Sequence, residues 1–313
     1  MLILNLLGFF ISCIILIKSS GFTIKSLSSL AKLLRISEFL ISFVIVGFIT
    51  ALPETSVAII SAINKVPEIG FGALLGSNIA DLSLVLGIIA LFGRKINIRS
   101  KTMLHELLYI VLTLIPLILA YDGVISRNDG IILITFYGVF ILHLFKKKHI
   151  LYKIIHHYKD KDLFENLIIF LGSILILYFS AHYVIKFAQA LSIDLSIPVI
   201  LIALILIGLG TCLPELLVAI KSIKLGHINF GLGEILGNVI IDATLMLGIT
   251  ALIHPIILEK ATVLITGSFL ILNVLIPLSI LRYRKALTQR DGLLFIFIYI
   301  LFVFVELSVK GVS

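Results

Sequence analysis

One stretch of this sequence occurs twice. Residues 47–59 read GFITALPETSVAI and residues 208–220 read GLGTCLPELLVAI, with eight of the thirteen positions identical at an offset of 161 residues. At the same offset, and without a gap, residues 70–88 match residues 231–249 at ten of nineteen positions. A duplication of this length predicts that the two halves of the chain fold as equivalent units.

The chain is too apolar for a soluble protein. Hydrophobic residues make up 60% of it and charged residues 13%, with a mean hydropathy of +1.22, whereas soluble domains are about 25% charged. Apolar stretches long enough to cross a bilayer, about 20 residues each, fall at roughly 2–20, 37–63, 70–93, 103–121, 130–146, 164–184, 197–222, 231–254, 261–281 and 292–309. We therefore predict an all-α polytopic membrane protein with ten transmembrane helices, five in each repeat.

An odd number of helices in each repeat makes the second copy enter the membrane from the opposite side. The predicted domains are a first five-helix repeat at 1–145, a basic linker at 146–163, and a second, inverted repeat at 164–313. All but five of the 25 Lys and Arg residues then lie on one side, and such a bias marks the cytoplasmic side. We expect a multi-pass plasma membrane protein with extracellular termini and a cytoplasmic 146–163 loop.

Both copies carry carboxylates and hydroxyls inside runs of Leu, Ile and Val. Ionisable residues in transmembrane segments are costly, which makes them candidates for function. Residues four apart share one face of a helix. The motifs contain four such polar pairs, two in each copy: Thr50 with Glu54, Ser77 with Asp81, Thr211 with Glu215, and Asn238 with Asp242.

Each copy also carries a proline that interrupts its helix. Pro53 and Pro214 remove a backbone donor and obstruct the preceding turn, so we expect free carbonyls around Gly47–Ala51 and Gly208–Cys212. Inverted repeats place such broken helices together near the bilayer midplane. The expected site is a cluster of four carboxylates, hydroxyls and carbonyls, with no basic residue in the motifs. Oxygen ligands of this kind suit Ca²⁺ and Na⁺ rather than Zn²⁺ or Cu²⁺.

Two copies of G-x-x-T-x-L-P-E followed by G-(S/N)-x-x-x-D resemble the sodium/calcium exchanger, or Ca²⁺:cation antiporter, family. The resemblance covers nearly the whole chain, and the short 146–163 loop is similar to that of prokaryotic members. It implies an antiporter rather than an enzyme, with alternating access to one central site and no cofactor. Its partners would be Ca²⁺ and Na⁺ ions and the lipid bilayer, with no nucleic acid and no obligatory protein partner. The cation ligands that the resemblance implies are Thr50, Glu54, Ser77, Asp81, Thr211, Glu215, Asn238 and Asp242, with carbonyls from Gly47 and Gly208.

Four positions depart from the family pattern in ways that bear on the coupling ion. Ala51 and Cys212 stand where Ser is usual, Asn238 where Ser is frequent, and Asp81 where many sodium-coupled members have Asn. Four carboxylates at close quarters disfavour joint ionisation. We therefore expect a proton on Asp81 or Asp242 in at least one transport state, and Ca²⁺/H⁺ exchange stays open as an alternative to Ca²⁺/Na⁺ exchange.

Two other classes of membrane protein share some of these features. An intramembrane aspartyl protease would use a pair of aspartates, but the motifs lack its G-x-G-D signature. A cation channel would suit acidic residues in a pore, but no stretch resembles a selectivity filter.

Glu234 lies four residues before Asn238, where the first repeat has Ala73. It would either draw cations into the inner mouth or reach water as an interfacial residue, and we favour the interfacial interpretation.

Overall fold

The computed structural model describes residues 1–31, 47–93, 95–97, 106–146, 160–224 and 228–310. Helices dominate these residues because a chain in lipid has to satisfy its backbone hydrogen bonds within each segment. The first half contains α1 (Leu2–Ala31), α3 (Gly47–Thr50), α4 (Leu52–Ile63), α5 (Pro67–Ala80), η2 (Asp81–Val85), α6 (Leu86–Gly93), β1 (Lys95–Asn97), α7 (Glu106–Leu119), η4 (Ala120–Asp122), β2 (Val124–Ile125) and α8 (Arg127–Lys146). The second half contains α9 (Asp160–Leu195), α10 (Val199–Leu201), η5 (Ile202–Ile207), α11 (Gly208–Thr211), α12 (Leu213–Lys224), α13 (Ile228–Ile240), η6 (Ile241–Met246), α14 (Leu247–Ile253), β3 (Ile256–Ile257), α15 (Lys260–Arg284), β4 (Ala286–Thr288) and α16 (Gln289–Lys310).

The predicted all-α membrane fold is confirmed, while the number of ten spans stays a prediction. Among the described residues, five helical segments are long and apolar enough to cross a membrane: Leu2–Ser19, Pro67–Gly93, Gly231–Ile253, Lys260–Arg284 and Gln289–Val309. Three shorter apolar segments are Leu52–Ile63, Leu108–Asp122 and Val199–Thr211. Most of the predicted linker, 147–159, lies outside the described residues. Helix α9 is longer than the predicted 164–184 at both ends, because a helix can continue past the apolar stretch that predicts it.

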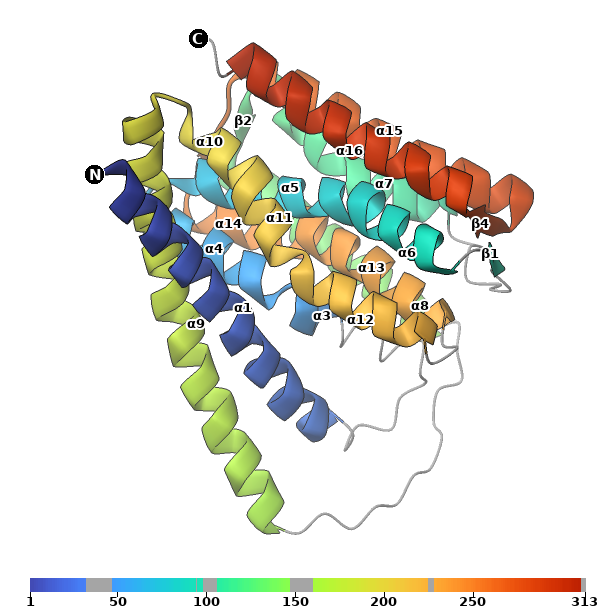
Figure 1. Cartoon of the computed structure of the whole chain (residues 1–313), viewed down its shortest axis with the longest axis horizontal. Helices are drawn as coiled ribbons and strands as arrows, with labels where there is room; N and C mark the ends of the chain where they lie inside the picture. The colour runs from blue at the N-terminus through green and yellow to red at the C-terminus, as the bar shows by residue number, and fades with distance from the viewer. Residues whose placement is uncertain (32–46, 94, 98–105, 147–159, 225–227, 311–313) are drawn as a thin grey trace.

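Helices α1 and α9 are equivalent in the two repeats and pack against each other in opposite directions (Figure 1). Near the start of α1, Asn5 Nδ2 donates to Asp194 Oδ2 of the last turns of α9 at 2.7 Å. Phe9 and Leu16 of α1 and Val184 of α9 belong to one buried apolar cluster. The antiparallel contact of equivalent helices is the arrangement expected of inverted repeats.

The two halves pack against each other through equivalent pairs of helices, each pair with one helix from either half. Helix α6 of the first half packs against α16, and its counterpart α14 packs against α8. A Cβ on Gly87 would lie 2.9 Å from the Gly292 carbonyl oxygen, and one on Gly248 would lie 2.8 Å from that of Gly130. The strands follow the same exchange, since β1 pairs with β4 and β2 pairs with β3, both antiparallel. Each half therefore completes the packing of the other.

The starts of α8 and α16 show that the duplication extends beyond the motifs. Before α8, the Ser126 backbone N and Oγ donate to Asp129 Oδ2 at 2.8 and 2.6 Å. Before α16, the Thr288 backbone N and Oγ1 donate to Asp291 Oδ2 at 2.9 and 2.7 Å. In each case the carboxylate at the third helical position accepts from the backbone N of the residue that precedes the helix, as in a capping box. The two caps are equivalent, with one residue inserted relative to the offset in the motifs.

The central helices are buried and the outer helices expose apolar side chains. Every described side chain of α5 except Glu68 is buried, including Phe71 and Leu74, which belong to the main apolar core. By contrast, Leu4 of α1 is 71% exposed and Phe304 of α16 is 67% exposed. Large apolar side chains facing outward suit a lipid environment. The motif segments therefore lie inside the bundle, where α4, α5, α11, α13 and α14 meet (Figure 1).

Candidate functional site

The two broken helices are interrupted in the same way. Ala51 separates α3 from α4, and Cys212 separates α11 from α12. The Ala51 backbone N donates to the Gly47 carbonyl at 3.0 Å, and the Cys212 backbone N donates to the Gly208 carbonyl at 3.2 Å. The Gly47 and Gly208 carbonyls are thus partly used, unlike the free carbonyls expected from the sequence. A carbonyl oxygen has two lone pairs. The Gly208 carbonyl also accepts from Thr211 Oγ1 at 3.2 Å, so both of its lone pairs are used. Thr50 Oγ1 lies equally far from the Gly47 carbonyl but has a shorter contact, 2.7 Å, with Glu234 Oε1, so the Gly47 carbonyl keeps capacity for one further partner.

Both aspartates of the motifs lie in π-helical segments. Asp81 opens η2 and Asp242 is the second residue of η6. In each segment a hydroxyl two residues after the aspartate donates to a backbone carbonyl four residues back: Ser83 to Ile79, and Thr244 to Ile240 at 2.5 Å. Short π-helical turns inside α-helices occur frequently at functional sites. Because the π-helical segments lie at equivalent positions in the two repeats, they support a functional role for the two aspartates.

The broken helix of each repeat lies against a motif helix of the other. A Cβ on Gly47 would lie 3.1 Å from the Asn238 backbone N, and one on Gly208 would lie 2.8 Å from the Ser77 backbone N. We call the first contact region the first half-site, with residues Gly47, Thr50, Glu54, Glu234 and Asn238. The equivalent residues form the second half-site, which consists of Gly208, Thr211, Glu215, Ala73 and Ser77. The neighbouring backbone leaves no room for a side chain at Gly208 and little room at Gly47, so glycine suits both crossings.

All the polar side chains predicted from the motifs are buried. Thr211 is 2% exposed, and 0% is found for Thr50, Glu54, Ser77, Asp81, Glu215, Asn238 and Asp242. The structure therefore brings the predicted residues into the interior of the bundle at the contact between the two repeats. Their roles as cation ligands stay predictions.

Asn238 connects two carboxylates from the first repeat. Its Nδ2 donates to Asp81 Oδ2 at 3.1 Å and lies 3.4 Å from Glu54 Oε1. Two carboxylates close together repel each other, and an amide donor between them offsets part of this cost. Asn238 and Asp81 are two of the positions that depart from the family pattern, and the structure shows that they contact each other.

Glu215 and Asp242 have no comparable hydrogen-bond donors. Within the part of the chain that the structure describes, no side chain donates to Glu215 or to Asp242, and the Ser77 hydroxyl has no hydrogen-bond partner. A buried carboxylate without donors is costly. The same arrangement leaves oxygen atoms available to a positively charged ligand.

The interfacial interpretation of Glu234 is wrong. Glu234 is 0% exposed, and its Oε1 accepts a hydrogen bond from Thr50 Oγ1 at 2.7 Å. Its side chain is shielded from water because α3 of the other repeat packs against α13. The one sequence signal was a carboxylate replacing Ala73 in an otherwise matching repeat. The buried region therefore holds a fifth carboxylate.

The carboxylates form an extended cluster rather than one compact cage. Glu54, Asp81, Glu215 and Glu234 lie close enough to interact electrostatically. Among the described residues, however, no three Asp, Glu, His or Cys side chains converge in a way that would hold a single metal ion. Hydroxyl, amide and carbonyl oxygens are therefore needed beside the carboxylates to surround a cation in this conformation.

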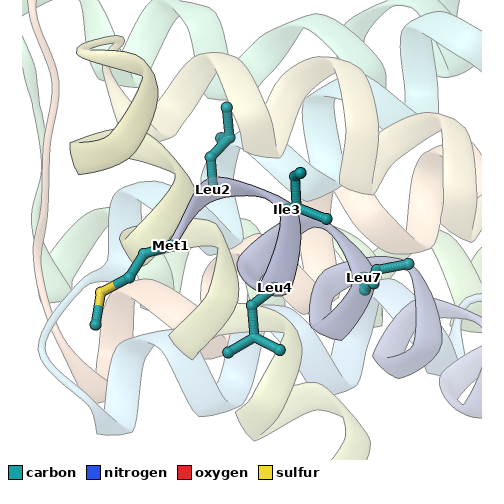
Figure 2. A pocket seen from close by; sticks show the side chains of 5 residues that line it. All are labelled: Met1, Leu2, Ile3, Leu4 and Leu7. Carbon is teal, nitrogen blue, oxygen red and sulfur yellow. The ribbon is translucent and has the colours of Figure 1, made fainter.

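A separate pocket near the N-terminus differs in chemistry from this cluster. It lies along the first turns of α1 and is lined by Met1, Leu2, Ile3, Leu4 and Leu7 (Figure 2). Its side chains offer no oxygen ligand, and its position on the outer surface of α1 suits lipid contact. The candidate site is the buried carboxylate cluster.

A duplicated helical unit with buried carboxylates at the contact of the two copies is typical of membrane transporters. Comparison with known proteins narrows this class. The family described as sodium/calcium exchanger protein matches residues 4–146 and 165–307. The chain therefore belongs to the sodium/calcium exchanger family, a family of ion antiporters and not of enzymes.

Curated relatives and solved structures agree with this assignment. The sodium/calcium exchanger MaX1 of Methanosarcina acetivorans is 25% identical over 367 residues, covering 97% of this chain and 99% of the relative. The inner membrane protein YrbG of Escherichia coli is 26% identical over 256 residues, covering 78% of each chain. A structure of the sodium-calcium exchanger NCX_Mj soaked with Na⁺ and Sr²⁺ superposes with a TM-score of 0.68 at 22% identity, covering 99% of both chains. At this identity the superposition shows a shared fold.

Proposed function

We propose that the chain is a secondary active antiporter that exchanges Ca²⁺ for Na⁺ by alternating access at the two half-sites. The observation that carries the proposal is the burial of Glu54, Asp81, Glu215 and Asp242 at the contact of the repeats, in motifs that contain no Lys, Arg or His. Unneutralised charges are expensive in a low-dielectric interior, and transported cations would offset that cost. The name of the relative MaX1, aligned over nearly the whole chain, supports the same ion pair.

In this proposal the site residues have different roles. Glu54 and Glu215 bind the cation in every ion state, and the two aspartates adjust the charge of the site. The hydroxyl and amide oxygens of Thr50, Ser77, Thr211 and Asn238 complete the shells, together with the Gly47 carbonyl. The Gly208 carbonyl would join them once the Thr211 hydroxyl, which donates to it at 3.2 Å, turns away from it. An all-oxygen shell with several carboxylates suits Ca²⁺, which takes six to eight oxygen ligands.

The domain division and membrane topology belong to the same proposal. The repeats at 1–145 and 164–313 would move relative to each other so that the site opens to one side at a time. In this proposal the 146–163 linker is cytoplasmic and both termini are extracellular, in a plasma membrane, and the excess of Lys and Arg on the linker side supports this orientation.

A second candidate is Ca²⁺/H⁺ exchange on the same fold. It is favoured by the two interrupting residues, since Ala51 carries no hydroxyl and the Cys212 Sγ lies 3.2 Å from the Leu209 carbonyl oxygen within its own helix. The loss of hydroxyl oxygens weakens the case for the Na⁺ sites, and Asp81 adds a carboxylate that a proton can neutralise.

Uptake of ⁴⁵Ca²⁺ into proteoliposomes separates the two candidates. Uptake is measured under an outward Na⁺ gradient, under an outward proton gradient of matched size, and with no gradient. We expect uptake only under the Na⁺ gradient. Uptake driven by protons alone would replace Na⁺ by H⁺ as the coupling ion. If neither gradient drives uptake, Ca²⁺ exchange itself is rejected for this chain.

A further inference from the structure

We propose that Glu234 is a fifth carboxylate of the transport site, and that its carboxylate, the Thr50 hydroxyl and the Gly47 carbonyl form a cation subsite that the second half-site lacks. This inference rests on the proposed function, because it adds a ligand and a charge to the same site. It concerns a position where the two repeats differ.

The three groups are held together by the crossing of α3 and α13. Thr50 Oγ1 lies 2.7 Å from Glu234 Oε1 and 3.2 Å from the Gly47 carbonyl oxygen. A Cβ on Gly47 would approach the Glu234 carbonyl oxygen to 3.4 Å, so the backbones of the two segments are in contact. Within the described chain, Glu234 Oε2 has no hydrogen-bond partner although the residue is fully buried. This oxygen is available for a ligand.

The spacing of these oxygens fits one coordination shell. At metal–oxygen distances of about 2.4 Å, separations of 2.7 and 3.2 Å correspond to angles of about 70° and about 85° at the cation, near the values of about 72° and about 90° in a pentagonal bipyramid. The Thr50 hydroxyl has one hydrogen, and its shorter contact is with Glu234. The Gly47 carbonyl, which already accepts from Ala51, therefore keeps a lone pair for the cation.

The second half-site cannot form this arrangement. Ala73 occupies the position of Glu234, and Thr211 Oγ1 is near the Gly208 carbonyl at 3.2 Å with no carboxylate at the equivalent place. The extra negative charge therefore lies on one side of the repeat contact only. It also interacts with Glu54 and Asp81, so a cation bound there is attracted by several carboxylates at once.

The added charge should favour divalent over monovalent cations. The interaction of a fixed carboxylate with Ca²⁺ is twice that with Na⁺ at the same distance, and the number of charged ligands tunes Ca²⁺ affinity in protein sites. Glu234 is thus expected to raise the affinity for Ca²⁺ more than the affinity for Na⁺.

A nearly isosteric substitution separates this role from a structural one. In Glu234→Gln the side-chain carbonyl can still accept from Thr50, so a purely structural role predicts unchanged ion binding. Glu234→Ala reproduces the residue of the second half-site, where Ala73 is accommodated with 0% exposure, and serves as a second variant. The matched control is Glu68→Gln, which removes a carboxylate from the partly exposed first turn of α5.

The test is calorimetric titration of Ca²⁺ into purified, monodisperse protein, repeated in the presence of Na⁺ as competitor. We expect Glu234→Gln and Glu234→Ala to weaken Ca²⁺ binding about tenfold, with a change of at most about twofold for Na⁺, and Glu68→Gln to match the wild type. Wild-type Ca²⁺ affinity in both Glu234 variants, or equal losses for Ca²⁺ and Na⁺, would overturn the assignment while leaving the proposed function intact. A wild-type protein that neither binds nor exchanges Ca²⁺ would overturn both.

Discussion

The first half-site is connected by side-chain hydrogen bonds, and the second is not, although both are built from equivalent segments. In the first, Thr50 donates to Glu234 and Asn238 donates toward Glu54. In the second, as far as the structure describes the chain, Ser77 and Glu215 have no such partner. The glycines and helix interruptions that shape the backbone are shared, whereas the side chains at two positions have diverged. Duplication thus preserved the geometry of the crossing and left its charge distribution free to change.

The strongest test of the comparison is to remove, one at a time, the two equivalent glutamates, Glu54 in the first half-site and Glu215 in the second. Glu54→Gln and Glu215→Gln should each lower Ca²⁺ exchange at least about 100-fold, equivalent to about 2.7 kcal/mol, because a charged ligand is lost from a buried site. The measurement is ⁴⁵Ca²⁺ uptake into proteoliposomes, with size-exclusion profiles as the test of folding. Either variant exchanging Ca²⁺ at the wild-type rate would remove its half-site from the mechanism.

The Asn238 contact can be tested by making the first half-site resemble the second. Asn238→Ser introduces the residue found at Ser77 and removes the donor between Glu54 and Asp81, so exchange should fall about tenfold. Asp81→Asn in the same protein removes the repulsion, and the two changes should couple by about 1–2 kcal/mol. The measurement is a double-mutant cycle of Ca²⁺ exchange rates. Additive effects would contradict the bridging role of Asn238.

The two glycine crossings should differ in how much they tolerate a side chain. A Cβ on Gly208 would lie 2.7 to 2.9 Å from backbone atoms of Gly76 and Ser77, whereas one on Gly47 would meet its neighbours at 3.1 to 3.4 Å. Gly208→Ala should therefore destabilise the protein by about 1–3 kcal/mol, and Gly47→Ala by less. Thermal unfolding in detergent measures both.

Gly210 provides the control for this pair, since it lies in the same short helix with nothing within 4 Å of its would-be Cβ. Gly210→Ala should leave the midpoint unchanged or raise it, because Ala favours a helix over Gly by about 1 kcal/mol. Equal losses for all three variants would mean that close backbone contact is not the reason why glycine occurs at both crossings.

The smallest effect is expected for a buried carboxylate outside both half-sites. Glu306 of α16 is 0% exposed and accepts from Thr266 Oγ1 of α15 at 2.5 Å. Glu306→Gln keeps an acceptor for Thr266, so the apparent affinity for Ca²⁺ should change by less than about twofold. A loss like that of Glu54→Gln, measured in the same uptake assay, would extend the site beyond the two half-sites.

Much of the fold followed from the pattern of the sequence. The repeated motif predicted equivalent halves, and the isolated carboxylates in apolar runs predicted buried polar positions such as Glu54 and Asp242. These predictions depend on local periodicity and on the cost of burying charge, which are readable from the chain. The length of α9 was underestimated, because polar residues at its ends extend the helix without adding to an apolar stretch.

Glu234 shows where such reasoning stops. Its sequence neighbourhood is compatible with a helix end facing water, and only the position of α3 across α13 makes it a buried partner of Thr50. The contacts of Asn238 with Glu54 and Asp81 are also not predicted by the sequence, because the family pattern treats each position separately. Pairwise compensation between distant residues is visible only once their backbones are placed.

From the sequence alone it follows that two like units of apolar helices carry the same carboxylates, prolines and glycines, and hence that the interior of the bundle is acidic. The tertiary structure decided which of these groups meet: Thr50 with Glu234 and Asn238 with Glu54, pairs that are 184 residues apart in the chain. The reason is physical. Burial and helix formation depend on a residue and its near neighbours, whereas these hydrogen bonds depend on the angle and depth at which helices of opposite repeats cross, which their glycines permit.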